Sequence, residues 1–255
     1  AAPADWTGTL TIAGIQSKPV VLDATDTAIT AAAKVNATTE ATGVSAIARN
    51  VSLFSVDPAG IPGSFTLAVK GDNATAANVT FSATANTPAG LAEAVKSFND
   101  VSSQTGITAK LNTDGTAIIL TNEAGANIDI ANAASSSGAV ALAAQNAEAS
   151  LSSGALTFET APGFSAAAGA STVTMGTLEF SSDKGFSVSG TPATLVPTSA
   201  ASILVSVNTI DVSTVSGSTQ ALKVIDSALA AVNGQRASFG ALQARFETAI
   251  ANLNT

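Results

Sequence analysis

The chain has 255 residues and a formal net charge of −8, and only 11% of its residues are charged although 46% are hydrophobic. An acidic chain lacks the basic face that nucleic-acid phosphates or anionic lipids require, and no apolar run reaches the length of a membrane span, so we expect neither nucleic-acid nor membrane binding. Because the chain has no His, Cys or Tyr, imidazole and thiolate metal ligands, disulfides and the commonest general bases are missing, and we expect no metal, no cofactor and no enzyme activity.

The first half of the chain contains an imperfect repeat. Each copy has an alternating strand, a short helical pattern and two further strand-like segments in the same order. Asn36 precedes Gly43 by seven residues, and Asn99 precedes Gly106 by the same number. The shared order and spacing indicate a duplicated unit. The segments lie at 8–14, 26–36, 43–46 and 50–54 in the first copy and at 63–71, 88–99, 106–109 and 116–121 in the second.

We therefore predict two strand–helix–strand modules, over residues 1–60 and 61–131. In each module the helix is expected to pack one apolar face onto a small sheet. The residues predicted to form these faces are Ile29 and Ala33 in the first module and Leu91, Val95 and Phe98 in the second.

Residues 132–202 are predicted to form an additional β-rich segment. Its first part, 132–155, is low in complexity and is interpreted as a loop or a short helix. Strand-like patterns follow at 156–160, 171–180 and 185–190.

The final segment, residues 203–255, is predicted to contain a strand at 203–212 and then one long helix. Ser218 is the expected N-cap, and the helical pattern continues to Asn254. The helix has three basic and two acidic residues, so the remainder, with seven basic and sixteen acidic residues, has a formal charge of −9. The overall fold class is thus α+β.

The apolar residues of this helix recur at alternating steps of three and four, with Arg236 and Gln243 at the two interrupted positions. This heptad spacing is typical of helices that wind around other helices, yet no second long helical pattern occurs in the sequence. A second apolar stripe lies beside it, at Val224, Ala228, Ala231, Leu242 and Ala249. The heptad row, here named the seam, consists of Leu222, Ile225, Leu229, Val232, Phe239, Phe246, Ile250 and Leu253.

Residues 208–253, NTIDVSTVSGSTQALKVIDSALAAVNGQRASFGALQARFETAIANL, resemble the carboxy-terminal conserved segment of bacterial flagellins. The resemblance rests on the TIDVST entry to the helix and on the VNGQRA and FGALQARF runs within it. The repeated unit also resembles a small module of flagellin outer domains and some hook-associated proteins. The Ile-Asn pair of that module appears here as Val35-Asn36 and Phe98-Asn99.

The resemblance implies a structural subunit of the flagellar filament, active in motility, outside the cell and exported without a cleaved signal peptide. The repeated modules would then be outer, surface-exposed domains, and residues 203–255 would be part of a rod domain whose other helices cover the seam. Its implied partners are other flagellin subunits, antibodies and an innate immune Toll-like receptor. Arg236, Gln243, Arg245 and Glu247 match the region of receptor contact, and rod packing or lateral filament contact is an equal alternative for them.

Two other functions stay open from the sequence. One is a hook–filament junction protein, which is similar in kind to a filament subunit. The other is a surface adhesin built on the β-rich modules, which belongs to a different functional class. A separate binding module would have no use for an uncovered seam, which favours the filament subunit. The resemblance implies a fragment that lacks the amino-terminal helices and the terminal core segments of a flagellin. Because the family's main receptor-contact helix is amino-terminal, we expect weak receptor activation by this chain. We expect monomers with some tendency to pair through the helix and no filaments, because the core segments are missing and the formal charge of −9 repels neighbouring copies at low salt.

Overall fold

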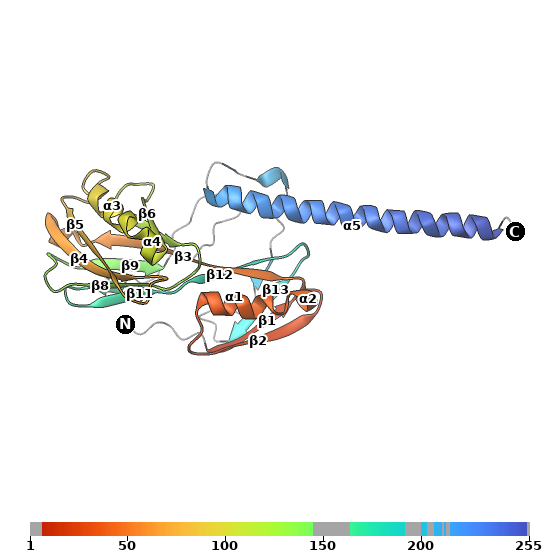
Figure 1. The fold of residues 1–255 in the computed structure, drawn as a ribbon, viewed down its shortest axis with the longest axis horizontal. Coiled ribbons are helices and arrows are strands. Elements are labelled where there is room, and N and C mark those ends of the chain that lie inside the picture. The colour runs from red at the N-terminus through yellow and green to blue at the C-terminus, as the bar shows by residue number, and fades with distance from the viewer. Residues whose placement is uncertain are drawn as a thin grey trace.

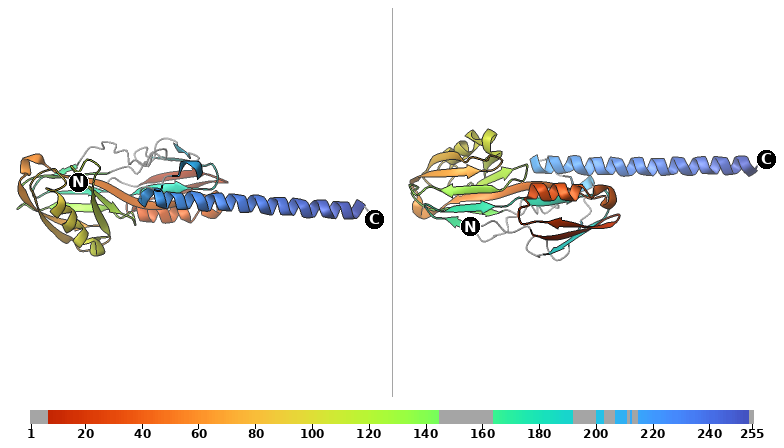
Figure 2. Two further views of the ribbon diagram at one scale, coloured as in Figure 1. Left: turned by 90° about the horizontal axis from the view of Figure 1, so that it is seen from above. Right: turned by 60° about the horizontal axis from the view of Figure 1, so that its bottom comes forward.

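The structure is a computed structural model that describes residues 7–144, 164–191, 200–202, 207–210, 212 and 215–253. Figure 1 shows two β-rich bodies and one long helix, α5 (Val215–Leu253), that extends well beyond them. In both views of Figure 2 the carboxy-terminal part of α5 projects beyond the bodies. The mixture of helices and strands confirms the α+β class.

The first body is built on a four-stranded antiparallel sheet in the order β14–β13–β1–β2. The helix α1 (Ala28–Asn36) covers it, and a four-residue helix, α2 (Thr39–Thr42), follows. Alternate residues of the strands, such as Leu10 and Ile12, point into the first core with the small side chains of α1. The strands are β1 (Gly8–Ala13), β2 (Ser17–Leu22), β13 (Ser187–Thr191) and β14 (Ala200–Ala201).

The strand β3 (Ser45–Val56) belongs to both bodies. Its first half pairs with β12 (Thr177–Ser181) beside the first core. Its second half pairs with β7 and β9 in the second body. The first body therefore comprises residues 8–48, 175–191 and 200–201, whereas the second comprises 51–144 and 164–174.

In the second body two antiparallel sheets enclose one core. One sheet has the order β10–β9–β3–β7–β6 and the other β11–β8–β4–β5. A short 3-10 turn (Pro58–Gly60) leads from β3 into β4, and α3 (Ala92–Asp100) and α4 (Ser102–Thr105) lie between β5 and β6. The strands are β4 (Gly63–Lys70), β5 (Ala77–Ala83), β6 (Ile107–Leu111), β7 (Ile118–Asn122), β8 (Ile128–Asn132), β9 (Val140–Ala144), β10 (Phe164–Ala166) and β11 (Ser171–Thr174).

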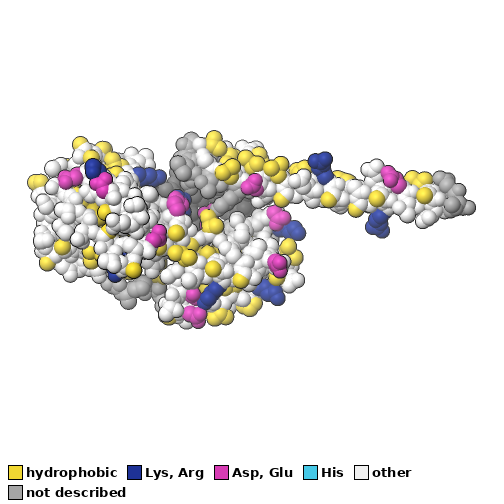
Figure 3. All heavy atoms as spheres, in the orientation of Figure 1, with side chains coloured by type: hydrophobic (Ala, Val, Ile, Leu, Met, Phe, Trp, Pro, Cys, Tyr) yellow, Lys and Arg dark blue, Asp and Glu magenta, His cyan; other side chains and the backbone are white. Residues whose placement is uncertain are grey.

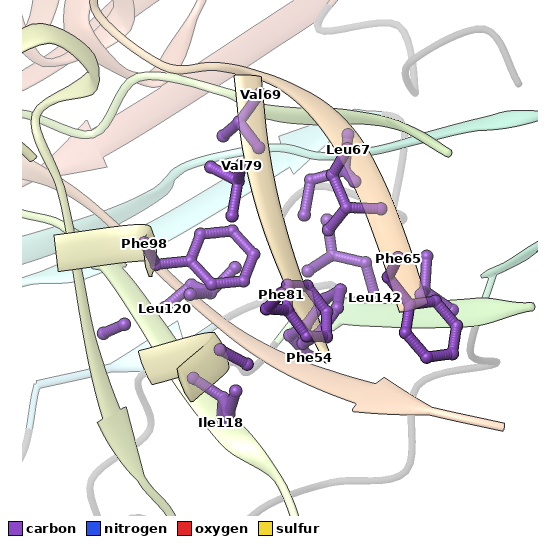
Figure 4. Packing of buried hydrophobic residues seen from close by; sticks show 14 of the residues in the cluster. Phe54, Phe65, Leu67, Val69, Val79, Phe81, Phe98, Ile118, Leu120 and Leu142 are labelled. Carbon is purple, nitrogen blue, oxygen red and sulfur yellow. The ribbon is translucent and has the colours of Figure 1, made fainter. Parts of the chain in front are cut away.

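Four fully buried phenylalanines join the two sheets to α3 in the second core (Figure 4). Phe54 lies 5.2 Å from Phe98 and 6.2 Å from Phe81, and Phe65 stacks on Phe81 at 5.4 Å between ring centroids. Edge and offset contacts of this kind add to the stabilisation from burial alone. The fully buried aromatic side chains of the described chain are thus in the second body.

The repeated segments adopt the same order of elements, and that order includes a second strand before the helix, which the sequence did not indicate. The segment predicted at 50–54 and the end of the one at 43–46 lie in the single strand β3. A hairpin, β1–β2 or β4–β5, is followed by a nine-residue helix, a four-residue helix and a strand. Gly43 and Gly106 end the four-residue helices with φ of 71° and 67°, the left-handed conformation that glycine adopts at low cost. The strand–helix–strand description is therefore incomplete, and the module boundaries 1–60 and 61–131 stay predictions.

The same two asparagines make the same contacts in both segments. The Asn36 side chain donates to the carbonyl of Ala46 and accepts from its N–H, both at 2.8 Å. Asn99 donates to the carbonyl of Ala109 at 2.9 Å and accepts from its N–H at 2.8 Å. Each amide thereby takes the place of a neighbouring strand along β3 or β6, which gives the shared Asn a physical reason.

Several local expectations from the sequence are wrong. On α1 the buried residues are Ala28, Ala31, Ala32 and Val35, and the predicted Ile29 is 43% exposed. Ala33, one helical turn after Ile29 on the same face, is exposed too. The helix packs through small residues on a different face, where close approach to the sheet leaves no room for a larger side chain such as Ile29. On α3, Phe98 is buried as predicted, and Val95 packs partly against the core.

The carboxy-terminal half also differs from expectation in four places. Residues 140–144, taken as loop or short helix, form β9, and the strand predicted at 171–180 is divided at residues 175–176. Residues Val207–Thr209, within a predicted strand, form a 3-10 turn. The helix α5 begins at Val215, so Ser218 lies inside it and not at its N-cap. The strand predicted at 156–160 lies outside the described residues.

Candidate functional site

The seam of α5 is the most prominent apolar surface of the described chain. Its residues from Leu222 to Ile250 are between 41% and 64% exposed, whereas large apolar side chains in the bodies are mostly buried. Phe239 and Phe246, both 61% exposed, contrast with Phe54, which is fully buried. Figure 3 shows apolar side chains along the length of the helix. Leu253 ends the helix, and its side chain lies outside the described part.

The helix is held to the rest of the described chain only at its start. It contacts the 3-10 turn Val207–Thr209, and Ala221 is buried there with 5% of its surface exposed. The Ser218 hydroxyl donates to the carbonyl of Val212 at 3.2 Å. From Leu229 onwards the described side chains are exposed, so the rest of α5 stands free of the two bodies.

The polar candidates lie on the same free part of the helix. Gln243 donates to the Glu247 carboxylate at 3.1 Å, one helical turn away. No ion pair among the described residues includes Arg236 or Arg245. Arg236 and Gln243 interrupt the seam at heptad positions that normally face a partner helix, where polar residues set register. Arg245 lines a shallow hollow on the second stripe with Thr248, Ala249 and neighbouring residues.

Two glycines weaken this helix without any packing reason in the described chain. A Cβ atom added to Gly234 or Gly240 would meet no atom within 4 Å. Each glycine costs a helix about 1 kcal/mol relative to alanine. Because helices without tertiary contacts are marginal in water, the free part of α5 requires neighbours to be stable.

The described residues offer no alternative site with chemistry. No group of three or more acidic side chains gathers there in a way that could hold a metal ion. None of the described helices combines the length and apolar character that a membrane crossing requires.

Comparison with known proteins points to one class: the chain has homologues among bacterial flagellins. The particular relatives include B-type flagellin of Pseudomonas aeruginosa, which is 30% identical over 214 residues, or 81% of the chain and 41% of that flagellin. Polar flagellin A of Vibrio parahaemolyticus is 58% identical, and flagellin B of Vibrio cholerae 54% identical, over 50 residues that make up 20% of the chain and 13% of each relative. No protein-family model matches the chain.

These alignments confirm the resemblance to flagellins and extend it. The Pseudomonas alignment covers far more than the segment 208–253 on which the resemblance was first based. The chain spans less than half of the length of these relatives. What the complete relatives do therefore bears on this chain only as a proposal.

Proposed function

We propose that this chain is part of a structural subunit of the bacterial flagellar filament and has no enzymatic activity. The observation that supports this most directly is the exposed heptad seam of α5 in a chain whose homologues are flagellins. A filament subunit needs a surface that stays apolar until neighbours cover it, and an exposed apolar surface of this kind is typical of an interaction site. The proposed location is accordingly the filament, outside the cell.

In this proposal the occupant of the seam is a helix of the same full-length protein, and further subunits pack against the resulting bundle. Burying an apolar side chain contributes roughly 1.5–3 kcal/mol, so covering several seam residues would outweigh the cost of Gly234 and Gly240. Arg236 and Gln243 then select the register of the partner helix, because an apolar neighbour opposite either would leave a polar group without a partner.

Two roles are proposed for Arg236, Gln243, Arg245 and Glu247. They contribute to lateral contacts between subunits, or they contact an innate immune receptor; antibodies are further proposed partners of the exposed bodies. Alanine substitutions in the full-length gene separate the two roles. Loss of swimming with unchanged receptor-reporter activation supports lateral contact, and the reverse supports receptor contact.

Immunogold electron microscopy of intact cells tests the proposed function. Antibodies raised against this chain are expected to label flagellar filaments along their whole length, and a strain with the gene deleted provides the control. Label confined to the base of the filament would instead identify a hook–filament junction protein. Label spread over the cell body would identify a surface adhesin, and either result would overturn the proposal.

A further inference from the structure

One face of β3 lies against both cores of the molecule. Since successive residues of a strand point to opposite faces, every second residue of β3 points the same way. On this face two polar residues separate two apolar pairs, and all six side chains are buried. From the first core to the second they are Ala46, Ala48, Asn50, Ser52, Phe54 and Val56.

The two polar residues are bonded to backbone and side chains of the second body. The Asn50 amide donates to the carbonyls of Ala126 at 2.9 Å and Thr174 at 3.1 Å. The Ser52 hydroxyl donates to Asn50 Oδ1 at 2.9 Å and lies 2.7 Å from the Thr174 hydroxyl. Asn50 and Ser52 have no exposed surface, so these bonds do not compete with water. We name Asn50, Ser52, Ala126 and Thr174 the polar joint.

Close backbone packing surrounds the polar joint. A Cβ on Gly176 would lie 2.3 Å from the carbonyl oxygen of Gly125, and a Cβ on Gly125 would lie 2.3 Å from the Cβ of Ala48. The Thr177 hydroxyl also donates to the carbonyl of Arg49 at 3.0 Å. Gly125 thus permits the loop after β7 to approach β3 closely, and Gly176 permits the bend between β11 and β12 to approach that loop.

Among the described residues, the chain crosses between the two bodies only at this place. It leaves the first body along β3 and returns through the bend between β11 and β12, so residues 51–174 form an insertion (Figure 1). The two crossing strands run side by side, with Arg49 opposite Thr177 as the last pair of β3 and β12. If these two crossing segments were not bonded to each other, the second body could twist relative to the first.

We propose that the polar joint holds the second body in one orientation relative to the first. Apolar contact is non-directional, whereas hydrogen bonds require defined distances and angles. A buried and fully bonded network therefore selects one relative arrangement of the two cores. Apolar residues at positions 50 and 52 would allow several arrangements. Asn50 is the central positioning residue, because its amide reaches both the β7–β8 loop and β11.

Pulsed electron resonance between two spin labels tests this proposal directly. The chain has no cysteine, so Ala33→Cys on α1 and Glu93→Cys on α3 place one label in each body at exposed positions. The doubly labelled chain is expected to give a single narrow distance peak. Adding Asn50→Ala should replace that peak with a broad distribution, because the carbonyls of Ala126 and Thr174 lose their donor.

Asn99→Ala is the matched control. It also removes an amide that donates one hydrogen bond and accepts another, but both join α3 to β6, and neither of these elements crosses between the bodies, so the narrow peak should persist. Circular dichroism verifies that each variant is folded. If Asn50→Ala does not fold, Ser52→Ala replaces it and removes the links to Asn50 and Thr174. A broad distribution in the unsubstituted chain, or a narrow peak in every folded joint variant, overturns the proposal.

Discussion

Few charged side chains are present in the two bodies, and individual polar residues there make specific hydrogen bonds to the backbone. Asn36 and Asn99 each satisfy both backbone groups of one strand residue, and Asn50 bonds the crossing strand β3 to the β7–β8 loop and to β11. An amide side chain suits these positions because it carries a donor and an acceptor, as a peptide group does. Asn36 and Asn99 therefore each take the place of a neighbouring strand.

Replacing Asn36 or Asn99 by alanine should destabilise its own body. Each substitution removes two hydrogen bonds and leaves a strand N–H and carbonyl without their partner, so we expect a loss of about 1–3 kcal/mol in the free energy of unfolding. Denaturant unfolding followed by circular dichroism measures it. Asn78→Ala, at an exposed position of β5, is the matched control and should change stability little. Equal effects at all three positions would contradict the assigned role.

Asp26, at the start of α1, provides an acid-sensitive contact. Its carboxylate accepts from the Asp23 N–H at 2.7 Å, from the Thr30 hydroxyl at 2.8 Å and from the Lys34 ammonium. Burial alone would raise the pKa of Asp26, but the hydrogen bonds from Asp23, Lys34 and Thr30 together hold it below its ordinary value of 3.8. The hydrogen bonds to Asp23 and Asp26 raise the pKa of Lys34 above 10.5.

The sign of the resulting pH dependence follows from linkage. The Asp26 carboxyl binds its proton more weakly in the folded chain than in the unfolded chain. Its contribution to the free energy of unfolding is therefore present above the pKa of the unfolded state and is lost as pH falls through the pKa of the folded state. Asp26→Asn should therefore flatten the loss of stability between about pH 5 and pH 2, measured by denaturant unfolding. Asp114→Asn, exposed in the β6–β7 turn, should leave that loss unchanged. The contribution of Lys34 to the free energy of unfolding has the opposite pH dependence, because its pKa is raised by folding, and it is lost only at strongly alkaline pH.

Among the elements, α5 is the one whose sequence does not match its surroundings in the described chain. Its apolar seam is exposed, and its two interior glycines have empty space where a side chain would stand. Both features are unfavourable for a solitary helix and favourable for a helix in a bundle, where glycine allows close approach of a neighbour. These features of α5 therefore indicate that it packs against a partner.

Gly234→Ala and Gly240→Ala should act in opposite directions in two assays. In this chain each should stabilise α5 by up to about 1 kcal/mol and raise helical circular dichroism, because nothing obstructs the added methyl group. In the full-length filament subunit that we propose, the same changes should reduce swimming in soft agar if a neighbour approaches the glycines closely. Ser238→Ala, on the same exposed stretch, is the control and should leave swimming unchanged. Normal swimming in both glycine variants would refute close packing there.

At the scale of the whole molecule, acidic bodies oppose the association that the seam favours. The described seam residues offer apolar surface, while the formal charge of −9 outside the helix makes copies repel each other. The repulsion acts through solvent and is screened within about 8 Å at physiological salt, whereas burial of apolar surface does not depend on screening. Association should therefore be weak and should increase with salt.

Analytical ultracentrifugation at low and high salt measures this balance. The chain is expected to be monomeric at low salt and to form some dimers as salt rises. Phe246→Lys should suppress the dimers because it places a charge in the middle of the seam. Val21→Lys, an exposed apolar position on β2, is the control and should leave them unchanged. Dimers that persist in Phe246→Lys would show that another surface mediates association.

The sequence by itself determined the local features of this protein. Heptad steps predicted α5, alternation predicted β1 and β4, and equal Asn-to-Gly spacing indicated two segments with the same order of elements. These features depend on periods of two or three and a half residues and on short-range turn chemistry, all of which can be counted along the chain. The seam could be predicted from the sequence for the same reason.

Only the tertiary structure decided how the strands are shared between the bodies. β1 pairs with β13, so that Leu10 lies opposite Gly190, and alternation indicates that a strand has a buried face but not which partner it pairs with. The strand β2 contains Pro19, which argues against a strand except at a sheet edge, where the structure places it. Asn50 and Ser52 looked like ordinary polar residues in a strand. Their role depends on Ala126 and Thr174, which are distant in the chain and come near only when the two cores have formed.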